Sequence, residues 1–197
     1  MNKLQHLINS GDYDKIEGWC SKEKAIKMTE YIDADFKLCV EFGVFAGKSL
    51  LPIAFKSKGQ VIGIDAWDVA SSLEGKNTKL NEEWWSVIDY NFFYNYTQKL
   101  LIKYNCNNVK LLRMKSTEAI SLFNDNQIDF LHQDSNHSEE ISCNEVELYY
   151  NKVKINGIWV FDDTNWETTK KAQNLLNSYG YVELYDSGTY KIYKRIK

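Results

Sequence analysis

Short apolar segments rich in β-branched residues alternate along the chain with longer amphipathic segments. Apolar runs of this length predict buried strands, and the segments between them predict helices. A sheet whose strands alternate with helices is typically parallel and covered by helices on both faces. The five predicted strands are Lys37–Phe42, Gln60–Asp65, Val109–Met114, Gln127–Asp134 and Lys154–Asp163.

The end of the chain has a different pattern. The run YGYVELYDSGTYKIYKRIK, residues 179–197, contains two strand-like segments on either side of Ser187-Gly188, which is a hairpin turn signal. The sequence therefore predicts an α/β fold with a mainly parallel seven-stranded sheet that ends in an antiparallel hairpin. One of the intervening helices is predicted from Ser49 to Lys56.

The segment Asn81–Tyr104 is unusually rich in aromatic residues. It predicts one long helix that packs most of its rings on the sheet. A few rings, such as Trp84, Trp85 or Tyr90, are candidates for the wall of a substrate pocket.

We expect a single domain over residues 1–197. Residues 1–36 are predicted to form an N-terminal helical segment and residues 37–197 the core, with an aromatic-rich helical insert at 70–104. A chain of 197 residues is long enough to bury a core of its own.

Charge and cysteine usage argue against several classes of protein. The net charge is −3 at pH 7 and no run of Lys or Arg suggests a basic groove, so nucleic acids are disfavoured as partners. Four scattered cysteines without a Cys-x-x-Cys pair indicate buried free thiols rather than a zinc site or a disulfide framework. Without a signal-peptide pattern or a run of about 18 apolar residues, we expect a cytoplasmic protein that does not bind membranes.

A glycine-rich turn follows the first predicted strand and ends in Gly-Lys-Ser, as a phosphate-binding P-loop does. A P-loop needs four residues between its first glycine and the Gly-Lys pair. Here only three residues separate Gly43 from Gly47. A nucleoside-triphosphate site is therefore disfavoured, and Lys48 is predicted to be solvated near the start of a helix.

Polar residues gather where the predicted strands end. In sheets of this kind, ligands bind outside the carboxyl ends of the strands. Acidic residues stand at four of the five ends, a pattern that folding alone does not require. The residues at these ends are Glu41-Phe42-Gly43, Asp65, Ser116-Thr117, Asp134 with His137, and Asp162-Asp163.

Four runs in this order, VEFGVFAGKS, VIGIDAWD, IDFLHQDSNHSEE and NGIWVFDDTNW, resemble the class I S-adenosylmethionine-dependent methyltransferases. The resemblance extends from about Leu38 to the C-terminus. It is strongest to the metal-assisted small-molecule O-methyltransferases, including the macrocin-type sugar O-methyltransferases and, more distantly, the catechol type. It implies a Rossmann-like class I methyltransferase fold and S-adenosylmethionine as cofactor, and a homodimer is compatible with it.

The resemblance also implies a cofactor site. Glu41 corresponds to the acidic residue beneath the loop that positions the amino-acid end of the cofactor, and Asp65 to the residue that accepts from both ribose hydroxyls. Glycines in the loop would let the backbone approach the cofactor closely. The structural alternative for Asp65 is a role in a turn or as a helix cap. For Ser116 the alternative is a role as a helix cap. The implied cofactor-binding residues are Glu41, Gly43, Val44, Phe45, Gly47, Ser49, Asp65, Ala66, Trp67, Ser116, Thr117 and Asp134.

A second implied site is a metal centre made of Asp134, Asp162 and Asp163. Three carboxylates brought together are costly to bury unless a cation neutralises them, and Mg²⁺ prefers oxygen ligands. Capping of the helix near Trp166 is the alternative role for the Asp162-Asp163 pair. His137 stands where the catechol-type enzymes carry a basic lysine, which makes it a candidate general base, with a loop histidine as the alternative.

The sequence thus predicts a cytoplasmic O-methyltransferase, assisted by a divalent metal such as Mg²⁺. Its expected catalytic residues are His137 and Asp134. The expected acceptor is a hydroxyl of a sugar or glycosylated small molecule. The alternatives are a methyltransferase-fold protein without a functional metal site and a nicotinamide-dependent Rossmann enzyme, although the loop lacks the full G-x-G-x-x-G pattern.

Overall fold

A computed structural model describes residues 2–76 and 78–197. Met1 of the expected N-terminal segment and Asn77 of the expected insert lie outside the described residues. Within the described residues, seven strands form one sheet in the order β3-β2-β1-β4-β5-β7-β6. They are β1 (Leu38–Phe42), β2 (Gln60–Asp65), β3 (Val109–Arg113), β4 (Ile128–Gln133), β5 (Val153–Phe161), β6 (Tyr181–Asp186) and β7 (Lys191–Arg195).

Strands β1 to β5 pair in parallel, whereas β7 pairs antiparallel with both β5 and β6. The predicted fold is therefore confirmed, including the C-terminal hairpin. Each of the five predicted parallel strands overlaps an observed one to within two residues at either end. Asp134 and Asp162 lie just past the ends of β4 and β5, at the edge of the sheet where the predicted site residues gather.

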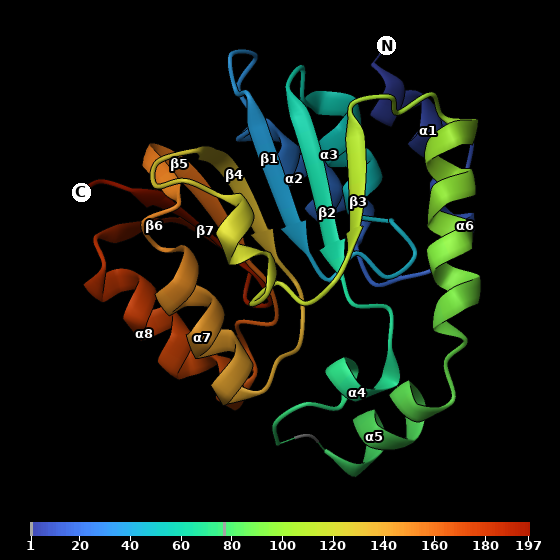
Figure 1. Ribbon diagram of the computed structural model, residues 1–197. Coiled ribbons are helices and arrows are strands. Elements are labelled where there is room, and N and C mark those ends of the chain that lie inside the picture. The colour runs from blue at the N-terminus through green and yellow to red at the C-terminus, as the bar shows by residue number, and fades with distance from the viewer. Residues whose placement is uncertain (1, 77) are drawn as a thin grey trace.

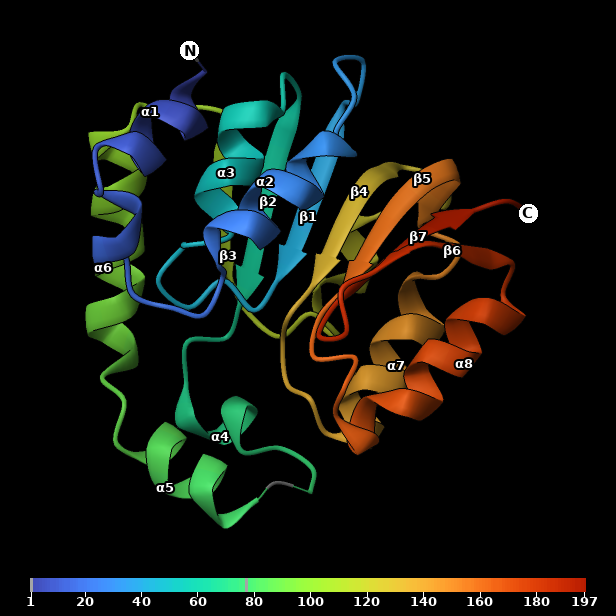
Figure 2. The ribbon, with the colours of Figure 1, turned by 180° about the vertical axis from the view of Figure 1, so that it is seen from behind.

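Helices cover both faces of the sheet (Figures 1 and 2). One apolar core joins the sheet to α1, α2, α3 and α6, and a second joins the opposite face to η2, α7 and α8. The α-helices are α1 (Lys3–Asn9), α2 (Lys22–Glu30), α3 (Leu50–Lys56), α4 (Val69–Ser72), α5 (Lys79–Ser86), α6 (Tyr90–Lys103), α7 (Glu139–Tyr149) and α8 (Lys170–Ser178). The described residues also form short 3₁₀ helices, η1 (Tyr13–Lys15), η2 (Ala119–Leu122) and η3 (Glu167–Thr169).

The aromatic-rich segment is divided, and the prediction of one helix over Asn81–Tyr104 was wrong. Helix α5 ends at Ser86 and α6 begins at Tyr90. Asp89 causes the break, because its side chain accepts the backbone N–H of Phe92 at 2.9 Å and so caps a new helix. The division lets α6 pack along the sheet while α5 lies with α4 beyond the carboxyl ends of the strands (Figure 1).

Among the described residues, no helix combines the length and apolarity needed to cross a membrane. The four cysteines are buried and free, as the sequence predicted.

Candidate active site

A cavity of about 710 Å³ opens at the carboxyl end of the parallel strands. Its wall combines the loops after all five parallel strands with the segment before α2 and with helices α4 and α5. Most of the predicted site residues line it, while Glu41 and Gly47 lie behind the wall. The predicted residues in the wall are Gly43, Val44, Phe45, Ser49, Asp65, Ala66, Trp67, Ser116, Thr117, Asp134, His137, Asp162 and Asp163.

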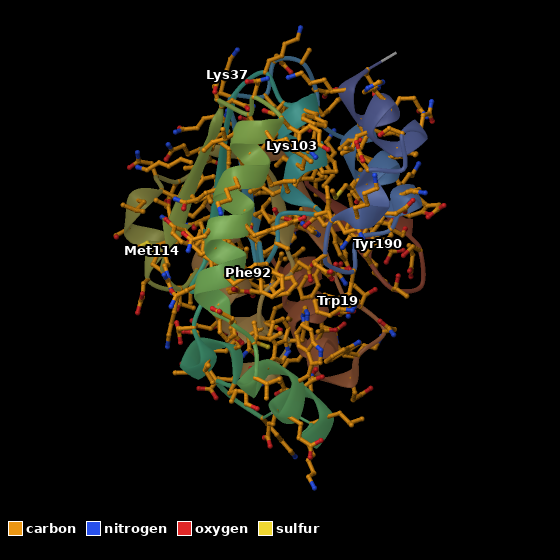
Figure 3. The ribbon with its side chains drawn as sticks, turned by 90° about the vertical axis from the view of Figure 1, so that its right-hand side faces the viewer. Trp19, Lys37, Phe92, Lys103, Met114 and Tyr190 are labelled. Carbon is orange, nitrogen blue, oxygen red and sulfur yellow. The ribbon has the colours of Figure 1, made fainter. Side chains whose placement is uncertain are left out.

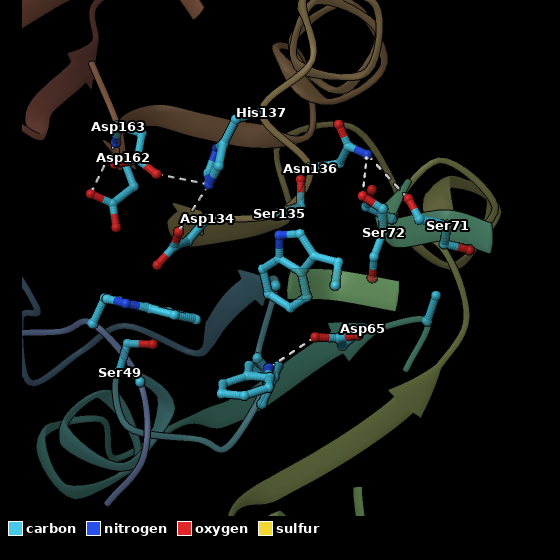
Figure 4. Close-up of a pocket in the computed structure, with 18 of the residues that line it drawn as sticks. Ser49, Asp65, Ser71, Ser72, Asp134, Ser135, Asn136, His137, Asp162 and Asp163 are labelled. Atoms are coloured by element: carbon cyan, nitrogen blue, oxygen red, sulfur yellow. Dashed lines mark hydrogen bonds and ion pairs between the residues drawn. The ribbon is translucent and has the colours of Figure 1, made fainter. Parts of the chain in front are cut away.

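Asp65 connects the loop after β1 to the loop after β2. One carboxylate oxygen accepts the backbone N–H of Phe45 at 2.9 Å, and the other accepts that of Trp67 at 2.7 Å. Both partners have positive φ, 47° for Phe45 and 45° for Trp67, which is uncommon outside glycine. The two hydrogen bonds stabilise this backbone, so Asp65 shapes the loops in addition to lining the cavity (Figure 4).

Trp67 supports the loop from behind. Its side chain is only 1% exposed, and its indole N–H donates to the carbonyl of Phe45 at 2.9 Å. Its ring also meets Tyr94 of α6 at a centroid distance of 4.9 Å. Only a small part of the ring therefore reaches the cavity, where the sequence predicts a contact with adenine.

The two loop glycines are needed for packing within the chain. A Cβ on Gly43 would lie 1.8 Å from the carbonyl oxygen of Asp134, and one on Gly47 would lie 3.1 Å from Cγ2 of Thr97. From the sequence, both glycines were expected to let the backbone approach a cofactor closely. The structure shows that the missing side chains make room for the β4 loop and for α6. Lys48, predicted to be solvated, is half-buried, with its Nζ 5.5 Å from the Tyr13 ring centroid.

Ser116 contributes to a buried hydrogen-bond network. Its hydroxyl donates to the carboxylate of Glu145 on α7, which also accepts from Ser135 at 2.6 Å and from Gln133 at 2.8 Å. Burial raises the pKa of Glu145, and these donors oppose the rise. Ser116 makes no helix-cap hydrogen bond, because η2 begins after Glu118 and has no side-chain cap. Sequence reasoning missed Glu145, which could have been found as the acidic residue on the buried face of α7.

Acidic and imidazole groups form two overlapping sets at the cavity, and all their members line it except the fully buried His132. The first contains His132, Asp134 and Asp162, and the second contains Asp134, His137 and Asp163; within each set the ligand atoms lie within 4.8 Å of one another. The expected trio of aspartates is thus divided, with Asp134 common to both sets. Asp163 has a φ of 50°, and this left-handed turn directs its side chain toward His137 rather than beside Asp162 (Figure 4).

His137 forms an ion pair with Asp163. Its Nε2 lies 2.8 Å from Oδ2 of Asp163 and 3.7 Å from Oδ1 of Asp134. Burial alone lowers the pKa of His137, but the hydrogen bond and the charges of Asp163 and Asp134 outweigh burial and raise it above its usual value. The pKa of Asp163 is lowered in turn: burial raises it, and the His137 partner more than compensates.

Neither His132, a member of the first set, nor Lys24, which reaches that set, was predicted as a site residue. His132 is fully buried in β4; its Nδ1 lies 2.7 Å from Oε1 of Glu41, and its Nε2 has no hydrogen-bond partner among the described residues. Lys24 of α2 makes an ion pair with Asp162, and its Nζ lies 3.6 Å from Oδ2 of Asp134. The sequence could have indicated His132 by its position in a strand two residues before Asp134. Nothing in the residues around Lys24 indicated that it belongs to the site.

Burial sets the protonation of the groups beneath the loop. It lowers the pKa of His132 well below its usual value, so the imidazole is neutral. Burial raises the pKa of Glu41 well above its usual value, although the hydroxyl of Ser49 opposes this. Burial also raises the pKa of Asp134, with Lys24 and His137 acting in the opposite direction.

Aromatic rings form one rim of the cavity. Trp19, from the loop before α2, stacks on Phe45 at a centroid distance of 5.6 Å and meets Trp84 edge-on at 4.9 Å. Trp85 contacts Phe45 edge-on at 5.9 Å. Trp19 is 70% exposed and lies between the end of the sheet and α5 (Figure 3). Trp84 and Trp85 thus line the cavity, as predicted for some rings of this segment.

The other rim is fixed by Asn136. Its side-chain amide donates to three backbone carbonyls at the end of α4, those of Ser71 at 3.1 Å, Ser72 at 3.3 Å and Glu74 at 2.8 Å. The β4 loop and the α4 segment therefore close this side of the cavity together (Figure 4).

The fold and the cavity define an α/β protein with a ligand site at the carboxyl ends of parallel strands. A family model described as a methyltransferase domain matches residues 40–164, and the chain belongs to this family. The protein is an S-adenosylmethionine-dependent methyltransferase. The nicotinamide-dependent alternative is therefore set aside.

Solved structures share the fold at low sequence identity. The O-methyltransferase NovP is 11% identical with a TM-score of 0.68, covering 91% of this chain and 84% of that chain. A precorrin-6y C5,15-methyltransferase from Geobacter metallireducens is 13% identical with a TM-score of 0.61, covering 91% and 93%. An rRNA methylase from Streptococcus thermophilus is 10% identical, also with a TM-score of 0.61, covering 91% and 98%. No curated protein matches the sequence.

We expect Asp65→Ala to weaken binding of adenosylhomocysteine by about 1–3 kcal/mol, the typical cost of losing partners for buried polar groups. The two loops would also lose the carboxylate that connects Phe45 to Trp67. Isothermal titration calorimetry measures the effect. Asp125→Ala, at an exposed ion pair with Lys152, is the matched control. Unchanged affinity in the Asp65 variant would contradict the cofactor role of Asp65.

Proposed function

We propose that this methyltransferase acts on a hydroxyl of a small molecule, with a sugar or glycosylated metabolite as the acceptor class. The observation that carries the proposal is a single cavity whose wall contains both the Asp65-linked loops and the cluster of Asp134, Asp162, Asp163 and His137. The first part suits the cofactor and the second suits a hydroxyl that must lose a proton. The aromatic rim suits stacking on a sugar face.

The residues present fit the cofactor. A cavity of about 710 Å³ is within the range of small-molecule sites. Beneath the loop, the buried Oε2 atom of Glu41 has no hydrogen-bond partner among the described residues, which leaves an acceptor for the amino-acid end of the cofactor, reached directly or through water. When bound, S-adenosylmethionine supplies the methyl group, which moves from its sulfonium sulfur to the acceptor oxygen.

The donor set also fits a divalent cation, because carboxylate oxygens from two strand ends converge in the cavity wall, and oxygen is the ligand that Mg²⁺ prefers. In the proposal Asp134 holds the cation together with Asp162 or Asp163. Such an ion would lower the pKa of the acceptor hydroxyl. The aspartates place negative charge beside the acceptor, and the loops after β1 and β4 hold the two reactants in line.

His137 is the proposed general base. Its Nε2–H donates to Oδ2 of Asp163, 2.8 Å away, so in the neutral ring Nδ1 is the nitrogen that takes the proton of the acceptor hydroxyl. Asp163 thereby orients the ring and stabilises the imidazolium that forms.

His137→Gln is expected to lower turnover at neutral pH by about 10²–10⁴-fold, the usual contribution of a positioned base. Because the pKa of His137 is raised, its base form accumulates only as pH rises through that raised value, so wild-type turnover should increase over this range. The variant should lose this increase. A pH–rate profile identical to that of the wild type would assign His137 a structural role instead.

The function itself is tested by mass spectrometry on a library of hydroxylated sugars and glycosides, with S-adenosylmethionine, in the presence and absence of a chelator. We expect products heavier by one methylene unit, with the new methyl on oxygen. Methylation confined to nitrogen or carbon would contradict the proposal.

A second candidate function is methylation without a metal. Lys24 favours it, because its ammonium group already pairs with Asp162 and approaches Asp134. In that case alignment of the reactants and the charge of Lys24 would replace the cation. Turnover unaffected by the chelator would support this candidate over metal assistance.

A further inference from the structure

We propose that His132 is a metal ligand and that His132, Asp134 and Asp162 form a site for a first-row transition ion, with Lys24 as the group that the ion displaces. This inference rests on the metal-assisted form of the proposed function and changes its ligand set, since the sequence indicated three aspartates and Mg²⁺. It adds a nitrogen ligand and removes Asp163.

The geometry around His132 is that of a histidine prepared for a metal. Its Nε2 lies 3.8 Å from Oδ2 of Asp162 and 4.0 Å from Oδ2 of Asp134. These separations are too long for hydrogen bonds, but they suit three atoms arranged around a common ion. The side chain is fully buried and the nitrogen has no partner among the described residues, so it faces the two carboxylates without satisfying either. Buried polar atoms are rarely left in this condition.

Glu41 completes the arrangement behind the ring. Its Oε1 lies 2.7 Å from Nδ1 of His132. Histidines that bind metals commonly donate their second ring N–H to a carboxylate, which fixes the tautomer and the ring orientation. With the proton on Nδ1 and shared with Glu41, the lone pair of Nε2 is directed at Asp134 and Asp162.

Lys24 does not complete this set. Its single positive charge faces two carboxylates, and it makes no hydrogen bond with Nε2 of His132. A divalent ion would balance both carboxylates and occupy the lone pair. The lysine also has another partner within reach, because its Nζ lies 5.7 Å from the ring centroid of Tyr190. A shift of the flexible side chain toward this ring would open the site.

The identity of the ligands selects the ion. Oxygen ligands alone suit Mg²⁺, whereas imidazole nitrogen favours ions later in the first transition series. We therefore expect Mn²⁺ to bind at least about tenfold more tightly than Mg²⁺.

The test is electron paramagnetic resonance of Mn²⁺ bound to the full chain, with spin-echo modulation to detect a coordinated nitrogen, and titration calorimetry for affinity. Wild type should bind one Mn²⁺ and show ¹⁴N coupling. His132→Gln should lose the coupling and weaken Mn²⁺ binding by about tenfold or more. His137→Gln is the matched control, because it removes the other imidazole of the cavity, and it should keep the coupling. Lys24→Met should tighten Mn²⁺ binding by removing the competing charge.

Several results would overturn the inference. One is Mn²⁺ binding without nitrogen coupling in the wild type, which would leave the aspartate site of the proposed function standing. Another is coupling that survives in His132→Gln and disappears in His137→Gln. Absence of Mn²⁺ binding in both the wild type and Lys24→Met would remove the metal altogether, while O-methylation would still be judged by the product analysis. If His132→Gln fails to fold, the wild type and His137→Gln still decide the matter, since both should show the coupling.

Discussion

Asp134→Asn should abolish binding of divalent ions and lower turnover by about 10²–10³-fold, the usual loss when a preorganised charged group is removed from a reaction centre. Asp134 is the one residue common to both sets of potential ligands found among the described residues, so its loss breaks either arrangement. Its backbone N–H donates to the carbonyl of Phe42 at 3.0 Å, and this contact is retained in the variant. The fold should therefore survive, with a thermal midpoint close to that of the wild type.

Calorimetry with Mn²⁺ and Mg²⁺, together with turnover on the acceptor found by the library screen, measures the Asp134 effect. Asp125→Asn serves as the control, because Asp125 pairs with Lys152 at an exposed site on another part of the surface. Normal metal stoichiometry in Asp134→Asn would show that the cation site lies elsewhere.

Gly43→Ala should destabilise the protein more than any other substitution considered. An added Cβ would lie 1.8 Å from the Asp134 carbonyl oxygen and 2.4 Å from its carbonyl carbon. The backbone at this point cannot move without separating the end of β1 from β2 and from β4. The N–H of Gly43 donates to Ile64 of β2, and that of Asp134, after β4, donates to Phe42 of β1, both at 3.0 Å. We expect a loss of about 3 kcal/mol or more in the free energy of unfolding, beyond the cost of the positive φ.

Gly11→Ala separates the steric clash of the added Cβ from the cost of the positive φ. Gly11 has a φ of 75°, close to the 79° of Gly43, but no described atom lies within 4 Å of the position that its Cβ would take. The free energy of unfolding of this control should fall by only about 1–2 kcal/mol, the cost of a left-handed conformation for a residue with a Cβ. Urea unfolding of both variants gives the comparison. Equal losses would mean that the loop after β1 adjusts freely, and the packing role assigned to Gly43 would be wrong.

The different origins of the site residues explain what sequence reasoning could find. Asp65 ends an apolar strand and Asp134 and Asp162 each follow one, and parallel strands bring their carboxyl ends to one edge of a sheet. Local pattern was therefore sufficient to group them. Lys24 lies on a helix about 110 residues before Asp134 in the chain, and only the packing of α2 against the sheet brings its ammonium group to the carboxylates.

The direction of side chains within the cluster was also beyond the sequence. Asp162 and Asp163 are neighbours in the chain, but the left-handed backbone at Asp163 assigns them to different sets. Likewise, nothing in the sequence distinguishes Asp89 from the other polar residues of the aromatic segment. Its side chain nevertheless accepts the backbone N–H of Phe92, and this hydrogen bond caps a new helix after the previous one has ended. Each outcome depends on the backbone conformation at one position, and competing local interactions determine that conformation.

The alternation of apolar runs by itself determined the sheet, the parallel direction of its first five strands and the edge at which the polar residues meet, because burial of strands and helices on both faces allows few other arrangements. Tertiary structure alone decided which partners those polar residues acquire. Lys24, Glu41 and His132 come together from a helix and two strands that are distant in the chain, and their interactions depend on distances and burial that no local pattern encodes.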